Sequence, residues 1–440
     1  MHAHLIVQRF VDTHLSLMHA ARRQMLCAAV TAAMAGHALS LSRLARAVTG
    51  SGRLKAALKR IDRLMGCARI EQEVELTAQA LLKQLSRVGQ TLVIAVDWSA
   101  VAPAGEFVEL RAAVTRPGMG RALSVYQRVY PLAKMGNARA ERALLEALRA
   151  WIEPGVEVSI VTDAGFRRPW FAYIEALGWS WIGRVRGRVC IGQAETQPTK
   201  VAHWGTRATG RATRWHDCTL SVREPWPCDL VLVRRRKVGR KHYARPGHGA
   251  IPKARAEARA SAHEPWLLAH SLKLRAYRAD EIVALYAQRM QIEENFRDTK
   301  SVSLGMGLEL SRSRSAQRLH ALLLIHTLAA FLLWHIGQLA EAEGLHRRFK
   351  ATTRTARELS LITLARLLCA LPKIPITEHA LLALYQRLGL RSRKTGETSA
   401  LEGYARDAKE NREETSLDEK AQCLPPWATG SRTLFSLPCP

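Results

Sequence analysis

The chain has 440 residues, of which 66 are Lys or Arg and 38 are Asp or Glu, so its formal net charge is +28. Such a positive field gathers polyanions and indicates a nucleic-acid partner, while a 48% hydrophobic share is enough for a packed core and excludes a wholly disordered basic chain. The eight cysteines are scattered, with no C-x-x-C pair and no Cys/His cluster at zinc-ligand spacing, which is typical of reduced cysteines in a cytosolic protein.

Residues 1–85 are predicted to form a helical domain, because Ala, Leu and Arg recur there at helical spacing. A helix over 42–48 ends at a Gly/Ser turn over 49–52, and a basic helix over 53–64 follows. This order is compatible with a helix-turn-helix that binds DNA, although many ordinary helical hairpins share it. The cations expected on the DNA-facing helix are Arg53, Lys55, Lys59, Arg60 and Arg63.

Residues 88–187 are predicted to alternate strands and helices, with an acid after each of two buried strands. The apolar run 91–96 leads to Asp97, and the run 156–162 leads to Asp163. Such runs are typical of buried strands in an α/β sheet, whose C-terminal edge carries the chemistry. A lone acid there is more often a helix cap or turn former, but two of them favour a shared site. Arg167 and Arg168 follow the second acid and are candidates for contacting the same ligand; surface ion pairs are the alternative.

Residues 188–275 are predicted to form a β-rich insertion, because the gap between Asp163 and the next candidate acid is too long for one strand and one helix. A basic stretch at 234–241 is interpreted either as a solvated loop or as a loop that contacts phosphates. Trp266 stands near the end of this region. It is either an indole that packs in the core at the start of a strand or a functional aromatic residue.

Residues 276–302 are predicted to form a helix with an unusual polar face. At about 100° per residue, Tyr286, Arg289, Glu293 and Lys300 lie within roughly 60° of one another. A carboxylate flanked by two cations and a phenol suits a metal ligand whose neighbours hold phosphates. An amphipathic helix with a polar face is the alternative. With Asp97 and Asp163, Glu293 makes a three-carboxylate metal site.

The remaining chain is predicted to be helical over 303–393 and disordered over 394–440, where the composition turns polar. The apolar segment 319–337 is long enough to suggest a membrane helix. It contains three histidines, however, so a buried core helix is the interpretation adopted here. The N-terminus has no apolar run that would indicate a signal peptide.

The spacing Y-x2-R-x3-E-x6-K at Tyr286, Arg289, Glu293 and Lys300 resembles the signature of DDE transposases of the bacterial insertion-sequence four family, and most of all its insertion-sequence-ten branch. The similarity extends over most of residues 1 to about 390. Its further shared stretches are 59–64, 96–99, 163–166, 184–187 and 288–294.

This resemblance implies an α/β fold: a ribonuclease-H-like catalytic core with a β-rich insertion, an all-α N-terminal DNA-binding domain and C-terminal helices. It implies that Asp97, Asp163 and Glu293 hold two Mg²⁺ ions about 3.5–4 Å apart, with Mn²⁺ as a substitute. Arg289 and Lys300 would grip phosphates, and Tyr286 would donate a hydrogen bond to one. Trp266 matches in position a tryptophan that stacks on an extruded base.

The expected activity is cut-and-paste transposition of an insertion sequence by end nicking, hairpin formation, hairpin opening and strand transfer. The expected partners are double-stranded DNA, as terminal inverted repeats and as target, and a second subunit paired on that DNA, without a membrane. The expected location is the bacterial cytoplasm, at the nucleoid. Two alternatives remain: a non-catalytic DNA-binding repressor derived from a transposase, and a structure-specific nuclease on the same core.

Overall fold

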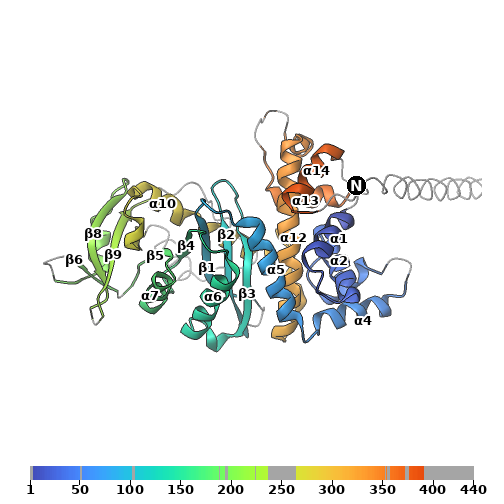
Figure 1. Ribbon diagram of the computed structural model, residues 1–440, viewed down its shortest axis with the longest axis horizontal. Coiled ribbons are helices and arrows are strands. Elements are labelled where there is room, and N and C mark those ends of the chain that lie inside the picture. Colours follow the sequence, from blue (N-terminus) through green and yellow to red (C-terminus); the bar gives the residue numbers. More distant parts are fainter. Residues whose placement is uncertain are drawn as a thin grey trace, which may run out of the picture. The chain divides into compact units, whose positions relative to one another are not determined.

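Ten strands form one mixed sheet in the order β3-β2-β1-β4-β5-β10-β9-β8-β6-β7 (Figure 1). β1 pairs antiparallel with β2, and β2 with β3, whereas β1 and β4, and β4 and β5, run parallel. The first five strands in this order, β3-β2-β1-β4-β5, have the arrangement of a ribonuclease-H-like core, so the predicted fold class is confirmed. These core strands are β1 (Leu92–Ala100), β2 (Phe107–Thr115), β3 (Leu123–Pro131), β4 (Val158–Thr162) and β5 (Ser180–Arg184).

The structure is a computed structural model. It describes residues 3–49, 52–101, 105–187, 189–193, 197–222, 224–235, 264–351, 353, 357–371 and 376–390. Most of the basic stretch at 234–241 and the whole predicted tail at 394–440 therefore lie outside the described residues.

The region predicted as a β-rich insertion continues the same sheet. β10 pairs antiparallel with β5 on one side and with β9 on the other, so the added strands extend the core without a break in hydrogen bonding. The strands are β6 (Cys190–Gln193), β7 (Thr199–Lys200), β8 (Thr213–Leu220), β9 (Trp226–Val233) and β10 (Trp266–His270), with helix α8 (Val201–Gly205) between β7 and β8.

Helices cover both faces of the core strands. α6 (Ala138–Trp151) and α7 (Arg168–Ala176) contact β2 and β5 from one face, and α10 (Ala279–Ala287) and α11 (Met290–Lys300) contact β1, β2, β4 and β5 from the other. Successive side chains of β1 point to opposite faces of the sheet. Ile94 and Val96 join the large core on one face, whereas Val93 packs with α10 and Ala95 with α11 on the other. Asp97, two residues beyond Ala95, therefore shares the face that α10 and α11 cover.

Helices also form both ends of the described chain, as predicted. α12 contacts α2, α4, α5, α13 and α14, and it packs against the edge strand β3 (Figure 1). The helices are α1 (Ala3–His14), α2 (Ala20–Met34), α3 (Leu41–Ala47), α4 (Leu54–Met65), α5 (Ile70–Leu85), α12 (Ala316–Ala342), α13 (Leu361–Cys369) and α14 (Glu378–Arg387).

α12 is the one described helix long and apolar enough to cross a membrane, and its most apolar stretch is completely buried within the protein. Apolar residues surround its whole circumference, as in the central helix of a globular core. α12 is therefore a core helix, as interpreted from the sequence.

Candidate active site

Two of the predicted acids lie side by side because two parallel strands bring them there. Val96 of β1 is in register with Thr162 of β4, and Asp97 and Asp163 are the residues that follow them along the chain. One detail differs from the prediction: β1 does not end at Asp97 but continues to Ala100, because β2 still pairs with it there. Asp97 thus projects from within a strand, and Asp163 from the turn after one.

The signature residues do not lie on one continuous helix, which corrects the sequence-based expectation. Tyr286 is near the end of α10, Glu293 and Lys300 are on α11, and Arg289 is in the two-residue junction between the helices. Arg289 keeps a helical backbone, but its N–H donates to the carbonyl of Tyr286, three residues back, instead of four. This tighter turn changes the angular positions that an ideal helix predicts.

Arg289 lies between all three carboxylates. Its Nη1 is 3.2 Å from Oδ2 of Asp97, and its Nη2 is 2.5 Å from Oε1 of Glu293 and 3.9 Å from Oδ2 of Asp163. Only 5% of its side chain is exposed. One buried guanidinium therefore offsets the mutual repulsion of three acids that come from β1, from the turn after β4 and from α11.

The two strand acids titrate differently. Burial is the main cause that raises the pKa of Asp97 to about 6; Arg289 opposes the rise, and the Asp163 and Glu293 carboxylates add to it. Burial acts on Asp163 in the same direction, but Arg289, a backbone N–H and two further arginines outweigh it and lower the pKa of that carboxyl. The pair has the divergent environments that neighbouring carboxylates take in many functional sites.

Tyr286 connects the carboxylates to Trp266. Its hydroxyl donates a hydrogen bond of 3.2 Å to Oδ1 of Asp163, and its ring meets the indole of Trp266 edge-on with centroids 4.9 Å apart. Trp266 is half-buried, and the guanidinium of Arg235 lies 4.7 Å over its ring. The structure thus places Trp266 beside the acids, with a cation on its indole.

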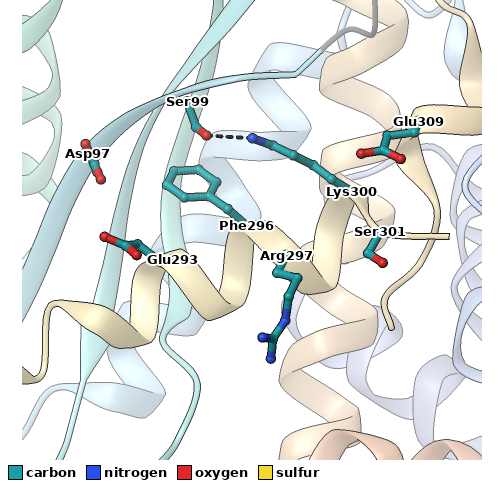
Figure 2. A pocket seen from close by; sticks show the side chains of 8 residues that line it. All are labelled: Asp97, Ser99, Glu293, Phe296, Arg297, Lys300, Ser301 and Glu309. Carbon is teal, nitrogen blue, oxygen red and sulfur yellow. Dashed lines mark hydrogen bonds between the residues drawn. The ribbon is translucent and has the colours of Figure 1, made fainter. Parts of the chain in front are cut away.

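Lys300 is on the wall of an open pocket of about 420 Å³ (Figure 2). Its ammonium donates a 2.6 Å hydrogen bond to Oγ of Ser99, and burial lowers its pKa. Figure 2 shows Asp97 and Glu293 projecting toward each other beside the ring of Phe296. The pocket lining is Asp97, Ser99, Glu293, Phe296, Arg297, Lys300, Ser301 and Glu309.

A buried network that the sequence did not indicate fixes α11 to the sheet. Arg111 of β2 is fully buried and donates to both carboxylate oxygens of Glu109, at 2.6 and 3.0 Å. The same guanidinium donates to Oδ1 of Asn295 and, at 3.1 Å, to Oγ1 of Thr299, and it lies 4.4 Å over the ring of Phe296. One sequence feature could have indicated this network. Glu109 and Arg111 are two residues apart in a mostly apolar strand, so their side chains lie on the same face of the sheet.

The remaining predicted contacts lie at the surface. Arg168 forms an ion pair with Glu224 and lies 5.3 Å over the ring of Trp226, which matches the surface alternative noted for it, and Arg167 is exposed. All five cations predicted for DNA binding by the N-terminal helix are exposed on or next to α4, and their binding role stays a prediction: Arg53, Lys55, Lys59, Arg60 and Arg63.

The donor set suits a hard divalent cation, because three carboxylates offer the oxygens that Mg²⁺ prefers. As they stand, however, the described residues contain no group of three or more His, Cys, Asp or Glu side chains that could hold a metal ion. The guanidinium of Arg289 lies between the carboxylates instead. Joint metal binding by Asp97, Asp163 and Glu293 requires Arg289 to turn away.

Part of the chain matches a known protein family. Residues 118–332 match the family model for a transposase DDE domain, a span that includes Asp163 and Glu293 and begins after Asp97. The chain therefore carries a transposase DDE domain. No curated protein matches significantly.

Among solved structures, the chain is similar to a piggyBac transposase in a synaptic complex with hairpin DNA, determined by cryo-EM. The identity is 11% and the TM-score 0.41, over 90% of this chain and 87% of that one.

Proposed function

We propose that this chain, whose residues 118–332 are a transposase DDE domain, catalyses cut-and-paste transposition of an insertion sequence. The observation that carries the proposal is the convergence of Asp97, Asp163 and Glu293 around one buried guanidinium. Three carboxylates from three elements, beside an open pocket with Lys300 on its wall, suit the in-line transfer of a phosphoryl group.

Asp97, Asp163 and Glu293 would hold the metal. Bound Mg²⁺, two ions per site with Mn²⁺ as a substitute, would activate the attacking hydroxyl and stabilise the leaving 3′-oxygen. In this proposal Arg289 exchanges its carboxylate partners for a DNA phosphate. Lys300 holds a second phosphate from the pocket wall, and Tyr286 turns its hydroxyl from Asp163 to the DNA. Charge-assisted hydrogen bonds of this kind position the strand.

The proposed sequence of steps follows from the resemblance to the insertion-sequence four family. A first cut frees a 3′-hydroxyl at the transposon end, and this hydroxyl attacks the opposite strand to form a hairpin. Water opens the hairpin, and the regenerated 3′-hydroxyl joins target DNA. Each step breaks one phosphodiester bond, and the attacking group at phosphorus is either water or a 3′-hydroxyl that forms a new phosphodiester bond. One set of residues can therefore serve all four steps.

The proposed partners are the terminal inverted repeats, target DNA and a second subunit paired on the DNA, with the protein at the bacterial nucleoid in the cytoplasm. Exposed cations on α4 would bind the repeat. Replacing Lys55 and Lys59 by Ala in the full chain should therefore weaken binding of the cognate end and reduce the dependence of its affinity on salt.

The test is cleavage of labelled DNA that carries the native end, in Mg²⁺, by Asp97→Asn, Asp163→Asn and Glu293→Gln. Each variant should lose nearly all cleavage and keep its affinity for DNA, because the basic side chains bind the phosphates. Glu153→Gln, at an exposed position after α6, is the control and should cleave as the wild type does. Cleavage at the wild-type rate by any of the three variants would refute the assignment. Cleavage without joining by the wild type would favour a nuclease.

A further inference from the structure

Three exposed aliphatic side chains stand at the rim of the pocket. Val302, Leu304 and Leu310, here called the rim patch, are 53%, 61% and 41% exposed. They follow α11 directly, and the neighbours Ser301 and Glu309 line the pocket itself (Figure 2). Exposed aliphatic residues are common singly, but three within nine residues beside a charged pocket are not explained by the fold.

The loop that presents the rim patch is held rigidly. The N–H groups of Gly305 and Gly307 each donate to the carbonyl of Ser301 at 3.0 Å, and the Leu304 N–H donates to its Oγ at 3.1 Å. The guanidinium of Arg366 donates to the carbonyl of Gly305 at 2.9 Å. These bonds hold the backbone in a tight turn, so the aliphatic side chains cannot simply fold back into the core.

Two glycines make this turn possible. A Cβ at Gly305 would lie 2.2 Å from the carbonyl oxygen of Asp298, and Gly307 has a φ of 64°. The Cβ position at Gly307 is also 3.6 Å from Cα of Val302 and 3.8 Å from Cδ1 of Leu310, so these two residues are neighbours. The backbone thus brings together Val302 and Leu310, two of the three residues of the rim patch.

Cations precede and follow the rim patch along the chain. Arg312 and Arg314 are exposed just after it, and Arg297 and Lys300 line the pocket just before it. An apolar partner protein would offer no opposite charge to the exposed Arg312 and Arg314, whereas DNA offers phosphates to the cations and apolar base faces to the aliphatic side chains. Several nucleic-acid-binding proteins combine such arginines with an aliphatic wedge between bases.

We propose that the rim patch packs against the bases next to the cleaved phosphate and keeps the two DNA strands apart there. The inference rests on the proposed function, because it assigns the DNA at the same pocket. Opening a base step costs a few kcal/mol, which aliphatic contacts with the freed bases offset in part.

The experiment compares two DNA ends with the full chain. One end is fully paired, and the other carries mismatches at the base pairs that flank the cleaved phosphate. Val302→Ser with Leu304→Ser should cut the paired end roughly tenfold more slowly than the wild type and the mismatched end at nearly the wild-type rate. Leu17→Ser, which removes a leucine that is 83% exposed between α1 and α2, is the matched control and should cut both ends normally.

The melting temperature should stay at its wild-type value in both variants, because the replaced side chains are exposed. Equal slowing on both ends, or no slowing on either, would overturn the inference. Loss of subunit pairing on DNA, measured by size-exclusion chromatography with light scattering, would assign the rim patch to a protein interface instead and would also overturn it. If the wild type cuts neither end, the proposed function fails, and the inference falls with it.

Discussion

At the scale of single residues, Arg289 explains how the carboxylates of Asp97, Asp163 and Glu293 can lie close together. Each carboxylate would repel the others, and this repulsion adds to the effect of burial, which is the main cause that raises the pKa of Asp97 to about 6. The guanidinium offsets part of their negative charge, and it is not among the residues that line the open pocket. The folded protein can therefore hold the three carboxylates close together, because the buried guanidinium of Arg289 lies between them.

Trp266 is the residue for which the structure adds most to the sequence. Its ring is edge-on to Tyr286, which hydrogen-bonds to Asp163, so it lies within two contacts of the acids. Arg235 covers one face of the indole at 4.7 Å, and an extruded base that stacks on this face would have to replace the cation. The position agrees with the expected stacking role, which stays a prediction.

Trp266→Ala should slow hairpin formation roughly ten- to hundredfold, because stacking of one base on an aromatic ring contributes about 1–3 kcal/mol. Nicking of the first strand, which needs no extruded base, should continue. Nicked and hairpin products separate on denaturing gels, and Trp266→Phe, which keeps a ring, should restore part of the second step. A parallel fall of both products would mean that Trp266 supports the fold instead.

The sequence predicted which acids lie together better than it predicted the place of Arg289 among them. Asp97 and Asp163 each follow a run of apolar residues, and Glu293 belongs to a spaced motif, so local patterns sufficed to find them. The central place of Arg289 depends on contacts between positions more than a hundred residues apart along the chain. No local pattern carries that information.

At the scale of elements, α11 is fixed to the sheet by packing and by hydrogen bonds from one buried arginine, Arg111 of β2. Ile292 and Phe296 pack on Ala95, Ala113 and Ala122, whose small side chains let the helix approach closely. The buried guanidinium of Arg111 connects β2 to two successive turns of the helix through Asn295 and Thr299. These contacts set where Glu293 stands relative to Asp97.

Arg111→Met should lower the free energy of unfolding by about 3–5 kcal/mol, because it leaves the fully buried Glu109 carboxylate without its partner. The double variant Arg111→Met with Glu109→Leu has no unpaired buried carboxylate, so it should recover part of the lost free energy of unfolding. Urea unfolding of the wild type and the variants measures both effects. A loss under 1 kcal/mol in the single variant would show that the pair does not hold α11 in place.

The break between α10 and α11 shows where helical periodicity fails as a guide. No proline or glycine stands between Tyr286 and Glu293, so an ideal helix was the natural expectation. The structure tightens the backbone at Gln288 and Arg289, where both N–H groups donate three residues back. α10 packs against β4 and β5 and α11 against β1 and β2, and contacts with different strands outweigh intrinsic helix preference.

At the scale of the whole molecule, α12 joins the N-terminal helices to the catalytic core. It contacts α2, α4 and α5 as well as β3, so the helical region and the sheet share one buried surface. The apolar composition of residues 319–337, together with their three histidines, predicted that α12 is buried. They could not predict its neighbours, because those contacts join residues from distant parts of the chain.

α12 also carries a buried histidine that makes acid stability testable. His335 packs against Phe331 and Trp334, and neither ring nitrogen has a hydrogen-bond partner among the described residues. Burial, together with Arg387 and Arg116, lowers the pKa of this imidazole from 6.5 to about 3. Between pH 6.5 and about 3, His335 is protonated in the unfolded chain but neutral in the folded protein. Its presence therefore lowers the free energy of unfolding as the pH falls below 6.5.

His335→Leu should therefore matter little at pH 7.5 and should stabilise the protein relative to wild type at pH 5. The expected difference at pH 5 is about 2 kcal/mol, because each pH unit below 6.5 contributes about 1.4 kcal/mol. Urea unfolding at both pH values measures it, with His379→Leu, at an exposed position on α14, as the control that should keep the wild-type dependence on pH. Equal effects of His335→Leu at the two pH values would mean that the folded protein accepts the proton, and that α12 opens to water in acid.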